Sequence, residues 1–407
     1  MAMGTNFFSF NLYSSLLLPA FLQGLLFTFL CFWRYRRDGG LADLFLALLL
    51  FCLTVRLSFW MLGFAGWYDR QDSLTTLMFY FPFNTLALMG PCLYFYFHSL
   101  TNRDFKFGLR YWSHLILPFL LLLLCLFKFI GDFAYYQPFP VNDGFQFGTR
   151  GPLAQLDKLD SVYAISYASV LFYLAIVIRR FRHYREYLLQ HFSGTEQVKL
   201  NWLRNSLWFT ALTLSVFFVF YVLGFAFHLS YGQNWLPYLL LGVVIYYLGI
   251  NGYEHHPEHF RHLQFTGRDT VTNVAPQMPE LENWKVLLSE LMEVEMPYLD
   301  ADLSLSRLAQ KLQTNPQAVS RIINDGYGQN FNDYINGLRV DAVIRQFSLK
   351  AQQRYSLMGI AYDCGFNAKT TFNRAFKKAT GLTPSAYLQK GVPNDDMNLL
   401  SGDKSAP

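Results

Sequence analysis

The chain has 407 residues, of which 53% are hydrophobic, 18% are aromatic and only 15% are charged. Soluble globular proteins average about 25% charged residues, so the composition excludes a single soluble domain. No charged residue occurs between Ser9 and Trp33, whereas charges are frequent beyond Glu254. The net charge of +5 combines basic loops with a basic C-terminal end and does not by itself indicate a partner. We therefore expect a membrane part up to about residue 253 and a soluble part after it.

Seven stretches of the first part are long and apolar enough to cross a bilayer, which takes about 20 mostly apolar residues. The first stretch is not a signal peptide, because it lacks a basic N-terminal region, has an overlong apolar core and is followed by Arg34, Arg36 and Arg37. The predicted spans are 13–33, 41–63, 74–98, 114–131, 161–179, 206–228 and 236–252.

The loops between these spans differ in their content of Lys and Arg, which accumulate on the cytoplasmic side of membrane proteins. If the loop after the first span is cytoplasmic, twelve basic residues lie inside: Arg34, Arg36, Arg37, Arg103, Lys106, Arg110, Arg179, Arg180, Arg182, Arg185, Lys199 and Arg204. Three lie outside: Arg70, Arg150 and Lys158. This bias predicts an outside N-terminus and a cytoplasmic C-terminal part.

Arg56 lies deep in the second predicted span. Charges inside a membrane are expensive, so a signal-sensing role is one interpretation of this residue. Arg56 is also only about 10 Å from the outer end of its helix, at 1.5 Å per residue, and its side chain could reach the membrane surface. Structural anchoring therefore stays open as well. Asp43 lies too far along the same helix to pair with it.

Other membrane-protein classes find little support in the first part. A retinal-binding protein needs a lysine in its last span, and "WLPYLLLGVVIYYLGINGY" has none. A transporter would more often show two related halves or glycine-rich breaks at the midplane, and we see no convincing repeat across residues 1–250. Nor does the chain contain a phosphate loop, a kinase motif, an HExxH motif or a convincing nucleophile and base. We predict no enzyme and no cofactor.

Neither the cysteines nor the histidines predict a metal site. The five cysteines offer no disulfide framework and no CxxC pair: Cys31, Cys52, Cys92, Cys125 and Cys364. Four histidines cluster in "YEHHPEHFRH": His255, His256, His259 and His262. Some of them have ligand spacing on a helix, but Pro257 disrupts any single helix there. We favour a polar juxtamembrane segment over metal binding or pH sensing, and assign residues 254–281 to a linker.

Two segments of the soluble part repeat each other. "SLSRLAQKL" begins at Ser304 and "SLMGIAYDC" at Ser356, and each serine can cap a helix. Apolar residues then match at an offset of 52: Leu305/Leu357, Leu308/Ile360, Ala309/Ala361 and Leu312/Cys364. After a turn, a second series matches at an offset of 53: Val319/Phe372, Ile322/Ala375 and Ile323/Phe376. Two short helices joined by a tight turn, with a small Ala where they cross, predict a helix-turn-helix in each segment.

The segment from about Pro297 to Lys390 closely resembles the AraC/XylS-type DNA-binding domain. The motifs "FNDYINGLRV", "GIAYDCGF" and "TFNRAFKKATGLTPSAY" carry the resemblance in order and spacing. It implies a seven-helix all-α domain with two helix-turn-helix units and a transcription regulator. One departure is Leu388 after Tyr387, where the family commonly has Arg. The resemblance covers roughly a quarter of the chain, and we carry no residues over to the membrane part.

The second helix of each unit presents a polar face suited to the major groove of DNA. The candidate DNA-binding residues are Asn315, Gln317, Ala318, Ser320, Arg321 and Asn324 in the first unit, and Lys369, Thr370, Asn373, Arg374, Lys377 and Lys378 in the second. Arg can read guanine, Asn can read adenine, and Lys supplies phosphate contacts. Between Phe366 and Gly391 there are five basic residues and no acid.

We therefore predict an all-α chain: a seven-span transmembrane bundle over residues 1–253, the linker, an AraC-type domain over 282–391, and a disordered tail over 392–407. The expected partners are double-stranded DNA, the lipid bilayer and an unidentified membrane or periplasmic signal. Because DNA is accessible from the cytoplasm only without a nucleus, we expect the inner membrane of a bacterium. The alternative is a membrane receptor or transporter whose helix-turn-helix domain binds a protein. The helix "NWKVLLSELMEV" could pair with itself in a homodimer.

Overall fold

The computed structural model describes residues 9–69, 73–102, 104–135, 151–155, 160–193, 201–227, 229–230, 232–254, 281–350 and 356–389. The chain forms two compact units. The N-terminal unit comprises Met1–Arg182 and Leu200–Thr266, and the C-terminal unit comprises His183–Lys199 and Gly267–Pro407. Among the described residues, helices are joined by turns, and the β pairing is confined to one isolated bridge between Phe192 and Ser304. The predicted all-α class is therefore confirmed.

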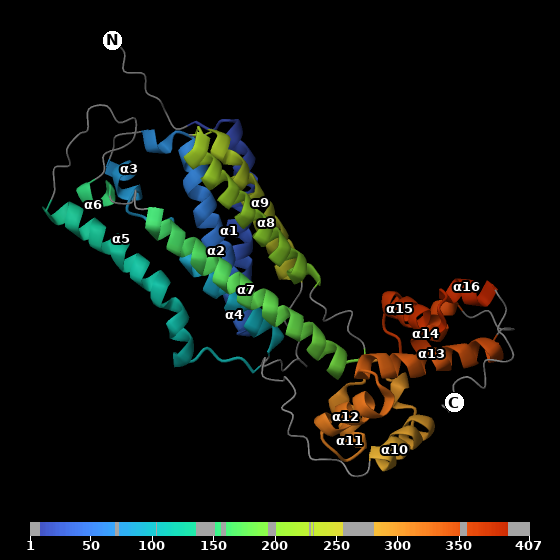
Figure 1. Cartoon of the computed structure of the whole chain (residues 1–407). Helices are drawn as coiled ribbons and strands as arrows, with labels where there is room; N and C mark the ends of the chain where they lie inside the picture. The colour runs from blue at the N-terminus through green and yellow to red at the C-terminus, as the bar shows by residue number, and fades with distance from the viewer. Residues whose placement is uncertain are drawn as a thin grey trace. The chain divides into compact units, whose positions relative to one another are not determined.

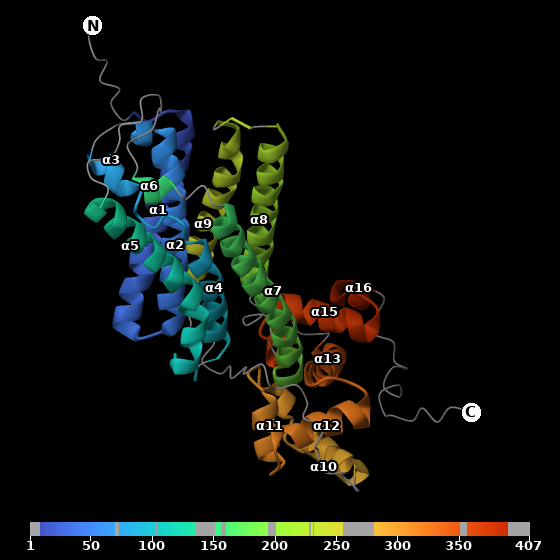
Figure 2. The ribbon, with the colours of Figure 1, turned by 60° about the vertical axis from the view of Figure 1, so that its left-hand side comes forward.

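The N-terminal unit is a set of long apolar helices. They are α1 (Leu12–Asp38), α2 (Leu41–Phe64), α4 (Leu86–Thr101), α5 (Ile116–Tyr135), α7 (Asp160–His191), α8 (Asn201–Phe227) and α9 (Leu236–Glu254), with the short α3 (Ser73–Met78) and α6 (Pro152–Gln155). Helices α1, α2 and α9 pack side by side, and α8 packs on α9 (Figures 1 and 2). Many side chains that point away from these contacts are apolar and exposed, as on a surface that faces lipid.

Six helices in the described part of the chain are long and apolar enough to cross a membrane. They are Leu12–Asp38, Leu41–Phe64, Leu109–Ala134, Ala164–His191, Asn201–Gly224 and Gly232–Glu254. These correspond to six of the seven predicted spans, so the predicted count is one too high. The predicted span 74–98 is instead interrupted. It contains α3, an irregular segment over residues 79–85 and then α4, which has only 16 residues.

The interruption has a local cause in the sequence around Pro82. A proline lacks the backbone N–H that a helix requires and its ring clashes with the preceding turn. The following backbone instead makes two tight turns, in which Phe83 N–H donates to Phe81 O at 2.8 Å and Thr85 N–H donates to Phe83 O at 2.9 Å. The hydroxyl of Thr85 donates to Cys52 O on α2 at 2.7 Å, which fixes the irregular segment against its neighbour.

A buried ion pair joins one end of the bundle. Arg34 near the end of α1 pairs with Asp43 in the first turn of α2, and both are buried. Arg34 also donates to Tyr253 O on α9 at 2.7 Å, and its guanidinium lies 4.5 Å from the centre of the Tyr253 ring. A buried charge needs such partners, because desolvation would otherwise cost several kcal/mol. Arg34 was predicted only as a loop charge, but it connects three helices.

The C-terminal unit has seven α-helices within residues 281–389. They are α10 (Leu281–Val294), α11 (Leu305–Lys311), α12 (Pro316–Tyr327), α13 (Phe331–Lys350), α14 (Leu357–Asp363), α15 (Lys369–Thr380) and α16 (Pro384–Gln389). Their apolar faces meet in one core, which extends from Leu288 to Tyr387 and includes the predicted Val319, Ile323 and Phe376. Leu287 on α10 is 48% exposed. The unit also includes residues 183–199, which the sequence assigned to a loop of the membrane part.

Candidate nucleic-acid interface

Two helix pairs in the C-terminal unit have the same construction. In the first, the Ser304 side chain accepts a hydrogen bond from Arg307 N at the start of α11. In the second, Ser356 accepts one from Gly359 N at the start of α14. Both serines therefore act as the predicted N-caps, which satisfy backbone donors that have no partner inside the helix. Ala309 and Ala361 are at most 1% exposed, as expected for small residues where two helices cross.

The turns that follow α11 and α14 also match residue by residue. Gln313 and Gly365, 52 positions apart, both adopt positive φ, at 53° and 88°. Just beyond them, Thr314 N–H donates to Ala309 O at 2.9 Å, and Phe366 N–H donates to Ala361 O at 3.0 Å. Glycine is required at the second turn: a Cβ at position 365 would lie 2.6 Å from Tyr298 O. The repeat seen in the sequence is thus a repeat of backbone geometry.

Helix α12 is the second helix of the first pair. Val319, Ile322 and Ile323 are fully buried and hold it in the core. Asn315 caps it by accepting from Ala318 N at 2.8 Å, and Pro316 occupies the first helical position. Of the predicted DNA-binding residues, Asn315, Gln317 and Asn324 are exposed, and Ala318, Ser320 and Arg321 are half-buried.

The polar side chains of α12 also bond to one another. Arg321 Nε donates to Asp325 Oδ2 at 3.0 Å, four residues along the helix. The amide of Asn324 donates to Ser320 Oγ at 3.3 Å. The carboxylate of Asp325 offsets the Arg321 charge, so this face has little net charge of its own. A base contact by Arg321 would have to compete with the Asp325 pair.

Helix α15 is the second helix of the second pair and has a more basic outer face. Phe372 and Phe376 are fully buried against the core. All six predicted contact residues are exposed: Lys369, Thr370, Asn373, Arg374, Lys377 and Lys378. Lys378, at the edge of this face, pairs with Asp333 of α13 at 2.8 Å. The remaining residues present two lysines, an arginine, an asparagine and a threonine to solvent, with no acid on α15 itself.

A buried polar cluster, which the sequence did not indicate, lies at the centre of the C-terminal unit. Arg339 on α13 is 1% exposed. It donates to Tyr298 O at 2.6 Å, to Asp300 O at 2.7 Å and to Ser193 Oγ at 3.0 Å. Burial lowers the pKa of the Arg339 guanidinium to about 10, and the carboxylates of Asp300 and Asp302 oppose that shift. The group stays charged at neutral pH, and its partners compensate for its burial.

Ser193 supplies the other half of this cluster. Its hydroxyl donates to Leu303 O at 2.8 Å, and its carbonyl accepts from the side-chain amides of Asn332 at 2.7 Å and Asn336 at 3.2 Å. Asn332 also donates to Phe192 O at 3.0 Å. Ser193 is fully buried and lies two residues after the end of α7. The two residues that follow α7 therefore bond to α13, the helix on which both candidate recognition helices pack.

The predicted signal-sensing residue lies in a closely packed part of the N-terminal unit. Arg56 is 7% exposed and does not extend to the surface. It borders a space of only about 30 Å³, together with Leu53, Tyr167 and Thr213. That volume has room for about one water molecule. The structure does not test a signalling role, which stays a prediction. The histidine-rich junction, the linker and the C-terminal tail lie outside the described residues.

Comparison with known proteins places a helix-turn-helix domain family on residues 308–390. The chain is 28% identical over 83 residues to the HTH-type transcriptional regulator Rv1931c of Mycobacterium tuberculosis, covering 20% of this chain and 31% of the relative. It is 27% identical over 127 residues to the transcriptional activator RhrA of Rhizobium meliloti, covering 31% and 39%. The regulatory protein YesN of Bacillus subtilis, itself uncharacterized, is 32% identical over 91 residues, covering 22% and 24%.

One solved structure, a Listeria innocua protein of unknown function, is 27% identical, with a TM-score of 0.23; the match covers 26% of this chain and 95% of that one. The chain covers less than two fifths of the length of each curated relative named above. The family match over residues 308–390 and the paired helices define the C-terminal unit as a helix-turn-helix domain. More particularly, it is a domain of the AraC type.

Proposed function

We propose that the protein is a membrane-integral, one-component transcription regulator. It binds double-stranded DNA sequence-specifically through α12 and α15, under the control of a signal sensed by the N-terminal unit. The observation that carries the proposal is the exposed basic face of α15, on an AraC-type domain that shares one chain with six helices of membrane-spanning length. The six basic residues from Arg179 to Arg204 lie where the chain passes from α7 to α8, and two further spans, α8 and α9, return the chain to that side before the C-terminal unit. This charge favours a cytoplasmic DNA-binding domain in the inner membrane of a bacterium.

The packing of both helix pairs on one helix supports joint DNA binding. Both α12 and α15 pack on α13, which has 20 residues. In this arrangement α15 supplies most of the electrostatic attraction, because Arg321 on α12 is shared with Asp325.

The position of the end of α7 provides a way for a signal in the N-terminal unit to control DNA binding. Its first residues belong to the N-terminal unit and its last residues to the C-terminal unit. Phe192 and Ser193 then bond to α13 and to the segment before α11. A change in the N-terminal unit that moves α7 would act on the helix that carries both recognition helices.

Val286, Leu287 and Val294 on α10 are exposed and offer a surface for a homodimer.

DNA binding by the full chain in lipid nanodiscs tests the proposal. Genome-wide mapping of the bound DNA gives the target sites, and fluorescence anisotropy then compares a recovered site with a scrambled duplex at several salt concentrations. We expect affinity that falls with salt and is at least 10³-fold higher for the specific site, as for other sequence-specific regulators. Equal affinity for both duplexes would overturn the proposal and favour the alternative, a helix-turn-helix domain that binds a protein.

A further inference from the structure

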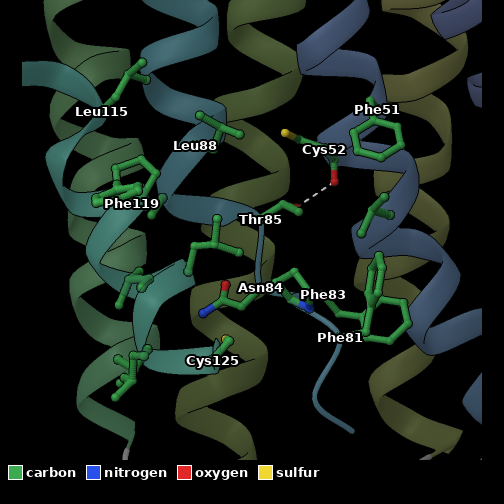
Figure 3. Close-up of a pocket in the computed structure, with 18 of the residues that line it drawn as sticks. Phe51, Cys52, Phe81, Phe83, Asn84, Thr85, Leu88, Leu115, Phe119 and Cys125 are labelled. Carbon is green, nitrogen blue, oxygen red and sulfur yellow. Dashed lines mark hydrogen bonds between the residues drawn. The ribbon is translucent and has the colours of Figure 1, made fainter. Parts of the chain in front are cut away.

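We infer that the N-terminal unit contains a binding site for a single-chain amphiphile whose polar end carries a hydrogen-bond donor. The site is a cavity of about 730 Å³ between α2, the irregular segment over residues 79–85 and α5 (Figure 3). Pockets of about 300–1,000 Å³ are typical for small organic ligands. The inference rests on the proposed function in one respect: it takes the bound ligand to be the signal that the regulator detects.

The walls of the cavity are almost entirely apolar. Aliphatic and aromatic side chains make up most of the lining, including Phe51, Phe83, Leu88, Leu115 and Phe119, which are drawn in Figure 3. No acidic side chain is among the residues that line it. Transfer of a hydrocarbon chain from water into such a space is favourable, roughly in proportion to the apolar area removed from water. The hydrophobic effect therefore selects a ligand with a long hydrocarbon part.

One polar atom in the lining points to the chemistry of the other end. Asn84 Oδ1 is buried and accepts no hydrogen bond from any residue that the structure describes. A buried acceptor without a donor is unfavourable, so most such atoms are satisfied. The neighbouring Thr85 hydroxyl cannot serve it, because it donates to Cys52 O. A hydroxyl or amide N–H on a ligand would satisfy Asn84.

The backbone of this segment supports a functional cavity. Non-helical backbone at membrane depth is tolerated only where it is buried in protein or lines a cavity. Phe81, Pro82 and Phe83 belong to the irregular segment, and all three line the cavity together with Asn84. The broken helix thus forms one wall of the site.

The lining residues labelled in Figure 3 spread between two ends of the cavity. Leu115 and Leu88 lie toward one end, and Asn84 and Cys125 lie toward the other, together with Phe81 and Phe83. Lys128, which also lines the cavity and is 8% exposed, lies one turn beyond Cys125 on α5. Leu115 and Lys128 are 13 residues apart, which is about 20 Å along a helix. A chain laid along α5 would place its polar group near Asn84.

Photocrosslinking of the full chain in phosphatidylcholine nanodiscs tests this site. The probe is a dodecanol with a diazirine in its chain, and the labelled peptides are mapped by mass spectrometry. We expect saturable labelling within residues 79–88 and 112–125. Unlabelled 1-dodecanol should compete about tenfold better than 1-methoxydodecane, which has the same chain and an oxygen but no donor.

Three variants test whether the labelling comes from the cavity and whether the preference for the alcohol comes from Asn84. Asn84→Leu removes the acceptor, and it should abolish the tenfold preference for the alcohol. Leu88→Trp fills the cavity and should remove most of the saturable labelling. Leu123→Trp is the matched control. Leu123 is exposed on α5, a helix that lines the cavity, but Leu123 itself is not among the lining residues. Labelling of this control should equal that of the unmodified chain.

Two results would overturn the inference. One is labelling that does not saturate and is unchanged in Leu88→Trp, which indicates ordinary contact with lipid. The other is equal competition by the alcohol and the ether. DNA binding measured on the same nanodisc preparation keeps the two proposals separate. Selective DNA binding without saturable labelling contradicts the ligand site alone, whereas saturable labelling without selective DNA binding contradicts the proposed regulator alone.

Discussion

The guanidinium of Arg339 donates a hydrogen bond to the hydroxyl of Ser193, 3.0 Å away and 146 residues earlier in the chain. Both side chains are buried. Arg339 belongs to α13, on which both candidate recognition helices pack, and Ser193 follows directly on the long helix α7. This contact is the point at which the first half of the chain enters the core of the DNA-binding unit.

Asn332→Leu should weaken this attachment, because it removes the amide that donates to Phe192 O and Ser193 O. Phe192 O would then lose its bond from Asn332, and Ser193 O would keep only the longer bond from Asn336, at a cost of about 1–3 kcal/mol. Hydrogen–deuterium exchange of the full chain in nanodiscs should show about tenfold or more faster exchange at residues 187–193. Asn324→Leu, at an exposed asparagine of α12, is the control. Equal exchange in both variants would mean that the attachment does not depend on Asn332.

Arg374→Ala should weaken specific DNA binding by about 1–3 kcal/mol and relax selectivity at one base pair, if Arg374 reads a base from α15. Lys377→Ala should weaken binding to all sequences alike and reduce the salt slope by about one, as expected for a phosphate contact. Arg345→Ala, at an exposed arginine of α13, serves as control. Fluorescence anisotropy across a salt series measures these effects. A Lys377→Ala variant that is selective for sequence would reverse the two assignments.

The two matched turns predict opposite effects of substitution. Gly365→Ala should destabilise the unit by about 2 kcal/mol or more, because φ is 88° and the new Cβ would lie 2.6 Å from Tyr298 O. Gln313→Gly, at φ 53°, should be neutral or stabilising by up to about 1 kcal/mol, since glycine adopts this region without strain. Native-state hydrogen–deuterium exchange of the full chain in nanodiscs measures both free energies. A stability loss at Gln313 larger than that at Gly365 would contradict the matched geometry.

Asp341 on α13 should make the stability of the unit depend on pH. Burial raises the pKa of its carboxyl to about 6, and Arg345 opposes the shift. The folded state therefore holds the proton more tightly than the unfolded state. This contribution to stability is complete below about pH 4, declines as pH rises and is lost above about pH 6.

Asp341→Asn, which stays neutral, should therefore raise the free energy of unfolding at pH 7. A full shift corresponds to about 3 kcal/mol, and the partial exposure of Asp341 reduces that to about 1–2 kcal/mol. At pH 4 the variant and the unmodified unit should be nearly equal. Urea unfolding at the two pH values measures the difference. An equal effect of the substitution at both would show that Asp341 does not titrate in this range.

The helix-turn-helix pairs could be predicted because their information is local. The caps Ser304 and Ser356, the alanines Ala309 and Ala361, and the buried Val319 and Phe372 lie at helical spacing, and all occupy the predicted positions. The interruption at Pro82 was missed because the surrounding residues are as apolar as a spanning helix. The sequence also did not indicate that Lys128 lines a cavity, because one lysine near the end of an apolar stretch does not alter the average hydropathy of that stretch.

The sequence by itself determined the all-α class, most of the long apolar helices and the AraC-type domain, because periodicity, hydropathy and capping act between residues close in the chain. Only the tertiary structure decided that Arg34 bonds to Asp43 and Tyr253, and that Asn84 faces a cavity. It also decided that Ser193 lies in the core of the DNA-binding unit. None of these residues stands in a local sequence pattern that marks its role. Whether a polar group is buried, and what satisfies it, depends on residues far away in the chain.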